Sequence, residues 1–67
     1  MEIHTEETKK TFINDELENG YTIGIVVDHM DKDAPFEFDI DIADFGWTSK
    51  ADVLKIKKMI NKALSIL

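Results

Sequence analysis

The feature that most constrains the fold is an amphipathic helical pattern in residues 50–67. With residues placed at about 100° intervals, the apolar side chains fall within an arc of roughly 160°. Lysines occupy the rest of the circumference, with Leu54 alone among them. The pattern predicts a helix over 49–67 whose apolar arc covers another part of the chain, with Ile60 near the middle of that arc. The arc consists of Ile66, Met59, Ala63, Ile56, Leu67, Ile60, Val53 and Leu64.

The residues before this pattern carry the signals of a helix start. Thr48 or Ser49 can accept a hydrogen bond from a backbone N–H group of the first turn, and Ser49 with Asp52 approximates a capping box. Gly46 permits a turn just ahead of the cap, where Trp47 is expected to pack.

The rest of the chain contains strand patterns, beginning with a hairpin. Residues 21–27 form a run rich in β-branched side chains, and the dipeptide Asn19-Gly20 before it is a strong hairpin signal. These features predict a hairpin over roughly 9–28, with a loop of either two or three residues.

The loop length decides which side chains share a face, because the side-chain period of a strand is two residues. A two-residue loop would set mostly polar side chains opposite the apolar face of the second strand. A three-residue loop, with Gly20 in the left-handed conformation, pairs Leu17 with Tyr21. It also pairs Ile13 with Ile25. We predict the three-residue loop, because it gathers apolar side chains on one face.

Residues 36–42 alternate between apolar and acidic side chains, which is typical of an antiparallel strand with one buried and one solvated face. Glu37, Asp39 and Asp41 form what we call the acidic stripe. They recur at about 6.6–6.8 Å, which is similar to the spacing of successive phosphates on a nucleic-acid strand. Residues 2–8 are polar apart from one isoleucine and either extend the first strand or fray.

These patterns predict one α+β domain over residues 1–67: a small antiparallel β-sheet, made of a hairpin and a third strand, packed by one C-terminal amphipathic helix, in the order ββ(β)α. The chain has no cysteine, so neither a disulfide nor a thiolate metal site supports it. A core of this size supplies a stability of roughly 3–5 kcal/mol, so additional stabilisation by a partner or by a homodimer is expected.

No apolar run approaches the roughly 18 residues of a membrane span, and no signal-peptide pattern is present. A cytoplasmic location is the default expectation.

Charge is divided unevenly along the chain. Residues 1–49 carry 13 acidic side chains against three lysines, a net charge of −10, whereas residues 50–67 carry five lysines against Asp52, a net charge of +4. There is no arginine. Nucleic-acid binding needs cations that displace counterions and favours Arg for bidentate contacts. Direct nucleic-acid binding is therefore not expected.

No catalytic, cofactor-binding or metal site is expected. His4 and His29 have no cysteine to activate, and no serine stands in a Gly-x-Ser-x-Gly elbow. The acidic loop with Asp28 and Asp31 lacks the ligand and the glycine that an EF-hand loop needs at its fifth and sixth positions. The tripeptide at 44–46 matches the metal-binding motif of protein kinases, but the other kinase motifs are missing.

The acidic stripe is the most informative candidate site. It is either a solubilising face or a surface that binds a basic partner. In its small size, acidity and lack of a catalytic set, the chain resembles the general type of phage-encoded inhibitors and DNA mimics, a likeness of profile without a shared motif.

The leading prediction is an inhibitory or regulatory protein-binding module that blocks a basic, nucleic-acid-binding site on a partner protein. The alternative is a self-associating module whose lysine-rich helix meets the acidic sheet of a second copy. The predicted partner-binding residues are Glu37, Asp39, Asp41, Asp28, Asp44, Phe45, Trp47 and Leu54.

Overall fold

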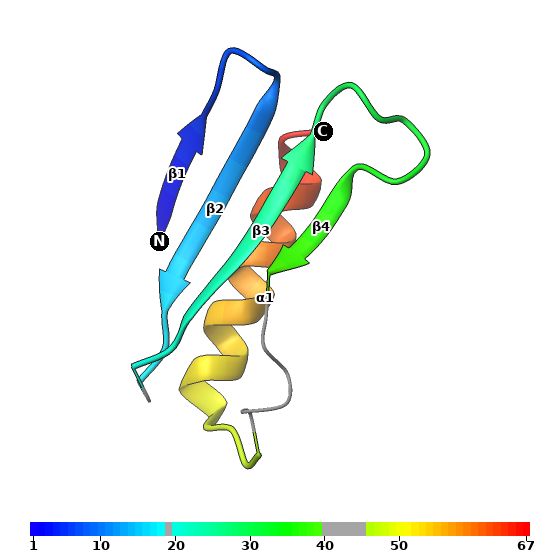
Figure 1. The fold of residues 1–67 in the computed structure, drawn as a ribbon. Coiled ribbons are helices and arrows are strands. Elements are labelled where there is room, and N and C mark those ends of the chain that lie inside the picture. Colours follow the sequence, from blue (N-terminus) through cyan, green and yellow to red (C-terminus); the bar gives the residue numbers. More distant parts are fainter. Residues whose placement is uncertain (19, 40–45) are drawn as a thin grey trace.

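The structure, a computed structural model, describes residues 1–18, 20–39 and 46–67. Its elements are β1 (Glu2–Thr5), β2 (Lys10–Glu16), β3 (Thr22–Asp28), β4 (Phe36–Asp39) and α1 (Lys50–Ser65). The four described strands form one antiparallel sheet in the order β1-β2-β3-β4, and α1 lies on one of its faces (Figure 1). The predicted α+β class, a small antiparallel sheet packed by a C-terminal helix, is confirmed.

The β2–β3 hairpin has the predicted three-residue loop. The backbone N–H of Leu17 donates to the carbonyl of Tyr21 over 2.8 Å, and Ile13 lies opposite Ile25. Gly20 has a φ of 91°, a left-handed conformation that glycine adopts without steric cost. The loop and the register are both confirmed.

The chain before β2 forms a strand of its own, an outcome that the sequence left open. In β1, Ile3 lies opposite Ile13. The turn to β2 is closed by the N–H of Glu6, which donates to the carbonyl of Lys10 over 2.8 Å, and Lys9 takes the left-handed conformation with a φ of 63°. With one apolar side chain in four residues, the sequence pattern of β1 could not be told from frayed chain.

The third predicted strand is present as β4, whose described part ends at Asp39. Phe36 lies opposite Val27 and Phe38 opposite Ile25, so both phenylalanines face the helix side of the sheet. The predicted alternation is therefore confirmed over these four residues, and the remainder of the predicted strand lies outside the described residues.

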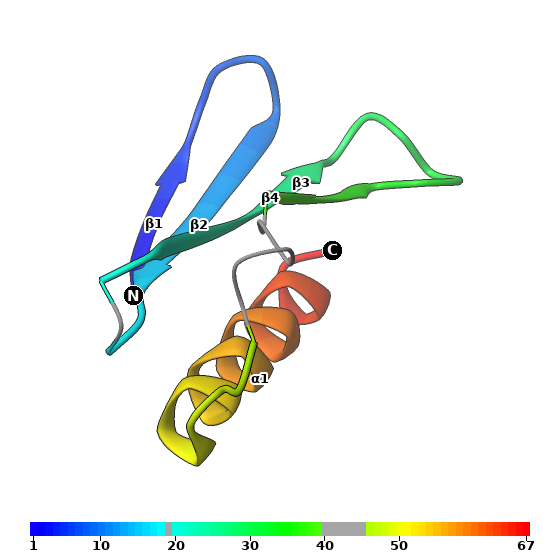
Figure 2. The same cartoon turned by 60° about the horizontal axis from the view of Figure 1, so that its bottom comes forward.

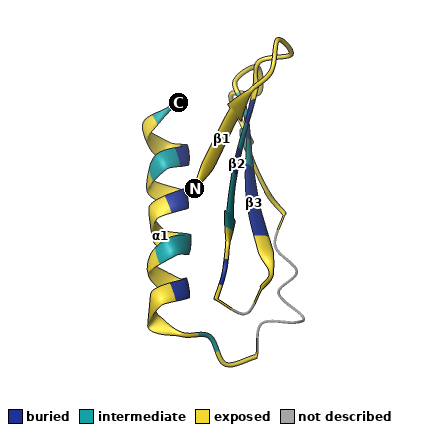
Figure 3. Ribbon diagram, turned by 90° about the vertical axis from the view of Figure 1, so that its left-hand side faces the viewer, coloured by how far each residue is buried: buried dark blue, intermediate teal, exposed yellow. Residues whose placement is uncertain are grey.

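The core lies between α1 and the two central strands, β2 and β3 (Figures 2 and 3). The buried stripe of α1 faces the sheet in Figure 3. Each fully buried aliphatic side chain contributes about 1.5–3 kcal/mol through removal from water. The buried cluster consists of Ile13, Leu17, Ile23, Ile25, Val27, Met59 and Ala63, with Phe36, Ile56 and Ile66 packed at its margin.

The helix is rotated about its axis relative to the predicted arc. Met59 and Ala63 are buried, whereas Ile60, expected near the middle of the arc, lies at its edge and is 37% exposed. Val53 and Leu64 are exposed as well. The prediction for Ile60 was therefore wrong, and the cause is the attachment of the helix to the β2–β3 hairpin.

Three hydrogen bonds make this attachment. Asp52, which is 3% exposed, accepts from the backbone N–H of Glu18 through Oδ1 over 2.9 Å. Ser49 Oγ donates to Glu18 Oε2 over 3.3 Å, and Lys55 Nζ donates to the carbonyl of Glu16 over 2.7 Å. Ser49, one of the two predicted cap residues, is also the N-cap and accepts from the N–H of Asp52 over 3.1 Å. The Asp52 carboxylate accepts a hydrogen bond from the hairpin, so the side of α1 that carries Asp52 faces the sheet. Ile60 is consequently turned to the edge of the buried surface.

Candidate functional site

The candidate site is the face of the sheet that points away from α1, which we call the open face. Side chains alternate between the two faces of a strand, and the buried residues Ile13 and Ile25 mark the covered face. The strand registers then assign the opposite face residue by residue. The open face consists of Glu2, His4, Lys10, Phe12, Asn14, Glu16, Thr22, Gly24, Val26, Asp28, Glu37 and Asp39.

An apolar pair lies at the centre of the open face. Phe12 and Val26 stand opposite each other on β2 and β3, and both are half-buried. His4 continues this row on β1, and Glu37 continues it on β4. The pair was not among the predicted site residues. The signal was nevertheless present, since the predicted hairpin register already places Phe12 on the solvent side.

The open face is acidic. Among the residues that the structure describes, it carries five carboxylates against Lys10. Glu37 and Asp39, the described part of the acidic stripe, are exposed and stand on the same side of β4. Neither carboxylate forms a hydrogen bond or an ion pair with any residue that the structure describes. Their charges are therefore available to a partner rather than used within the fold.

Gly24 of β3 lies opposite Asp39 and is buried. A Cβ atom added to Gly24 would lie 2.7 Å from Oδ1 of Asn14 and 3.6 Å from the Cβ of Asp39. The Asn14 side chain thus occupies the space that a side chain at Gly24 would fill.

Asp28, another predicted contact residue, lies near the acidic stripe. It helps to line a hollow of about 200 Å³ together with Glu37 and Asp31. Asp28 accepts from the N–H of Met30 over 3.0 Å, and Asp31 accepts from the N–H groups of the two residues at 33 and 34. These carboxylates order their own loop and add negative charge beside Glu37. Across the described ranges, no group of three or more His, Asp or Glu side chains is placed to hold a metal ion.

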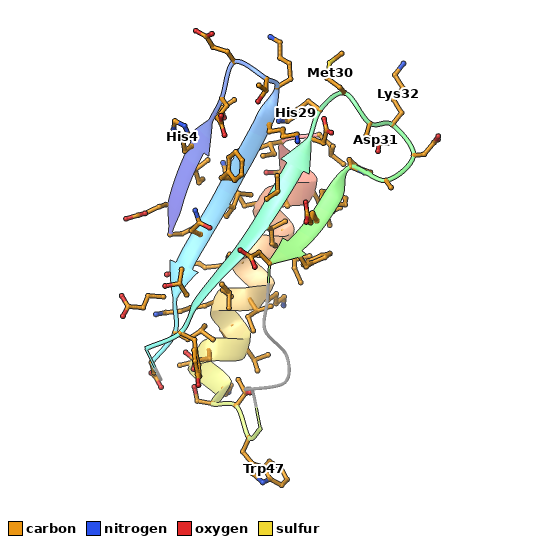
Figure 4. All side chains as sticks on the ribbon, viewed as in Figure 1. His4, His29, Met30, Asp31, Lys32 and Trp47 are labelled. Atoms are coloured by element: carbon orange, nitrogen blue, oxygen red, sulfur yellow. The ribbon has the colours of Figure 1, made fainter. Side chains whose placement is uncertain are left out.

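Two predicted contact residues lie away from the open face. Trp47 is wholly exposed, and Figure 4 shows it at the opposite end of the molecule from Met30. The expectation that Trp47 packs ahead of the helix cap was wrong, because the chain turns at Gly46, whose φ is 40°, and projects the indole into solvent. Leu54 is 51% exposed and borders a shallow hollow among the lysines of α1. Predicted contacts at Asp41, Asp44 and Phe45 lie outside the described residues.

The two histidines do not form a common site. His29 Nε2 lies 2.8 Å from the hydroxyl of Thr11, which lies 3.0 Å from the hydroxyl of Thr5. The backbone N–H of His29 also donates to the carbonyl of Lys9 over 2.9 Å. His29 thus fastens its loop to the β1–β2 turn, whereas His4 lies on β1, apart from it (Figure 4).

Comparison of the sequence with protein-family models and curated proteins, and of the structure with solved structures, found no match. In the ranges that the structure describes, no helix is both long enough and apolar enough to cross a bilayer.

Proposed function

We propose that this protein is a small cytoplasmic binding module that acts without catalysis, as an inhibitor or regulator, and that its open face binds a basic surface of a partner protein. The observation that carries the proposal is that the carboxylates of Glu37 and Asp39 are exposed and unpaired among the described residues. Two exposed carboxylates on one strand, without a counter-charge among the described residues, are not needed to hold the fold.

The chemistry of the open face favours a nucleic-acid-binding site as the surface that is blocked. Carboxylates on alternate residues of a strand stand about 6.6–6.8 Å apart, similar to successive phosphates, and a groove that binds phosphates would receive them. The surrounding field steers a basic partner towards the face. Phe12 and Val26 supply an apolar centre that water must leave when a partner binds. A DNA mimic of this kind is a competitor of nucleic acid.

The proposal is tested with the double variant Glu37→Gln/Asp39→Asn, which removes two charges and keeps the shape of both side chains. A matched control is Glu6→Gln/Glu7→Gln, which changes net charge equally in the exposed β1–β2 turn. Wild type and both variants are immobilised and exposed to cytosol from the native cell. Retained proteins are then challenged with salt and with duplex DNA.

We expect a basic protein that wild type and the control retain, that the double variant loses, and that both salt and duplex DNA displace. Equal retention on all three surfaces would contradict the proposed role of the acidic stripe. Retention that duplex DNA does not displace would contradict the mimicry of nucleic acid, and the partner surface would then be basic but unrelated to nucleic-acid binding.

A second candidate function is self-association, in which the lysine-rich side of α1 meets the open face of another copy. It is favoured by a shallow hollow of about 400 Å³ on the outer side of α1, lined by Leu54 together with Lys55, Lys57 and Lys58. Light scattering at micromolar concentration tests it directly. A homodimer or larger assembly would melt at a temperature that rises with protein concentration, whereas a monomer would not.

A further inference from the structure

The edge of β4 has free backbone groups. The N–H of Asp28 donates to the carbonyl of Pro35 over 2.7 Å, and hydrogen-bonded pairs in an antiparallel ladder recur every two residues. The backbone groups of Glu37 and Asp39 therefore point towards β3, and those of Phe36 and Phe38 point away from it. β4 is the last strand in the sheet order, and within the described part of the chain no strand pairs with this edge (Figure 1).

An apolar groove lies directly beneath this edge, between β4 and α1. Its volume is about 130 Å³. Phe38 and Leu64 form its outer walls and are 54% and 55% exposed. Every described side chain that lines the groove is apolar: Ile25, Phe36, Phe38, Ile60, Ala63 and Leu64.

The groove and the open face, which lie on the two sides of this edge, suit different kinds of side chain. A strand added beside β4 would alternate its side chains between the groove and the open face. On the groove side it would meet Phe38 and Leu64, and on the other side it would run beside the carboxylates of Glu37 and Asp39. Apolar side chains suit the first environment, and Lys or Arg side chains suit the second.

A second copy of this chain does not meet these requirements at its own edges. Pairing β4 with the β4 of a second copy would set Glu37 opposite a carboxylate of that copy, and like charges on opposed strands are destabilising. The other edge strand, β1, presents Glu2 and His4 on the open face, so it offers another carboxylate rather than two cations.

We propose that the edge of β4 binds an extended segment of a partner protein as an additional antiparallel strand. Apolar side chains of the segment fill the groove between β4 and α1, and the Lys or Arg side chains between them pair with Glu37 and Asp39. This is recognition by strand addition, in which backbone hydrogen bonds give affinity and alternate side chains give specificity. The inference rests on the proposed function, because it names the kind of basic segment that the acidic stripe binds.

The test uses a fluorescein-labelled peptide of the alternating sequence KVKIKVK, with blocked ends, and its anisotropy on titration with the full chain. A peptide of the same composition but broken alternation, VKKIKKV, is the first control. Two N-methylated forms of the alternating peptide provide the second. In the proposed arrangement the amides of the apolar residues face β4 and those of the lysines face away. N-methylation of the apolar residues should therefore abolish binding, and N-methylation of the lysines should leave binding nearly unchanged.

The matched protein variants are Leu64→Gln and Val53→Gln, which change two similarly exposed apolar side chains of α1, of which only Leu64 lines the groove. We expect Leu64→Gln to weaken binding of the alternating peptide by about tenfold, as loss of one partly buried leucine contact predicts. We expect the affinity of Val53→Gln for the alternating peptide to stay within about twofold of wild type, well below the change caused by loss of one large contact.

Equal binding of the alternating, scrambled and N-methylated peptides would overturn strand addition while leaving the charge attraction of the proposed function intact. Equal binding by Glu37→Gln/Asp39→Asn and wild type would instead contradict the proposed function. Absence of binding by every peptide would overturn strand addition, even if a basic protein partner were found. A dimer that Leu64→Gln converts to a monomer would show that a second copy covers the groove, and this would also overturn the proposal.

Discussion

Substitution of Asp52 by Ala is the sharpest test of how this fold is held together. Asp52 is the buried carboxylate of α1, and its Oδ1 accepts the backbone N–H of Glu18 over 2.9 Å. Asp52→Ala removes this acceptor and leaves the N–H of Glu18 without its partner. The cap bond from the backbone N–H of Asp52 to Ser49 is retained, because it does not involve the Asp52 side chain.

The size of the effect follows from two contributions. A hydrogen bond to a charged group is worth about 1.5–3 kcal/mol. A carboxylate in the first turn of a helix adds about 0.3–1 kcal/mol through the helix dipole. We expect the free energy of unfolding to fall by about 2–3 kcal/mol, which is most of the roughly 3–5 kcal/mol that a core of this size supplies.

Urea unfolding followed by circular dichroism measures this change. With a slope of about 1 kcal/mol per molar urea, the midpoint of Asp52→Ala should lie about 2–3 M below that of wild type. Asp52→Asn keeps an oxygen acceptor of the same shape and should lose only about 1 kcal/mol. Asp33→Ala, an exposed loop acid, should stay within about 0.5 kcal/mol of wild type. If Asp52→Ala unfolded at the same urea concentration as Asp33→Ala, the attachment of α1 to the hairpin would not determine stability.

Three further predictions concern the packing of α1, the hairpin loop and the open face. Met59→Ala should lower the free energy of unfolding by about 2–4 kcal/mol and Ile60→Ala by about 1 kcal/mol or less, and equal losses in urea titrations would contradict the observed rotation of α1. Gly20→Ala should cost about 1–2 kcal/mol because of the left-handed backbone, and a thermal melt at or above the wild-type temperature would argue against that conformation. Glu37→Gln/Asp39→Asn should melt at the wild-type temperature or slightly above it, since self-repulsion falls; a lower melting temperature would show that these carboxylates stabilise the fold.

Much of the fold could be predicted because it depends on local signals. The Asn-Gly loop and the alternation of apolar residues selected the hairpin register, which places Ile13 opposite Ile25. The helix cap at Ser49 also follows from residues within one turn. β1, by contrast, has no strong local signal. One apolar residue in four gives almost no periodicity, and the pairing of β1 to β2 is a tertiary interaction, so the sequence left this strand undecided.

The acidic stripe shows where sequence reasoning about the site succeeded and where it stopped. Alternation alone predicted that Glu37 and Asp39 share a solvated side of one strand, and the register of β4 against β3 bears this out. The apolar centre at Phe12 and Val26 follows from the register of the hairpin alone, but the alternation of apolar side chains drew attention only to the opposite face. The groove beneath β4 required the position of α1 as well, and no local pattern contains that position.

What the sequence determined by itself is therefore the hairpin, β4 and α1, the faces of these strands and the start of the helix, because each depends on signals in nearby residues. The tertiary structure alone decided which part of the apolar arc of α1 is buried. That choice depends on the hydrogen bond between Asp52 and Glu18, residues separated by 34 positions. A helix whose apolar arc is wider than the surface it covers can be seated in several rotations, and a single buried polar contact selects one of them. The rotation selected here exposes Leu64 and forms the groove beside β4.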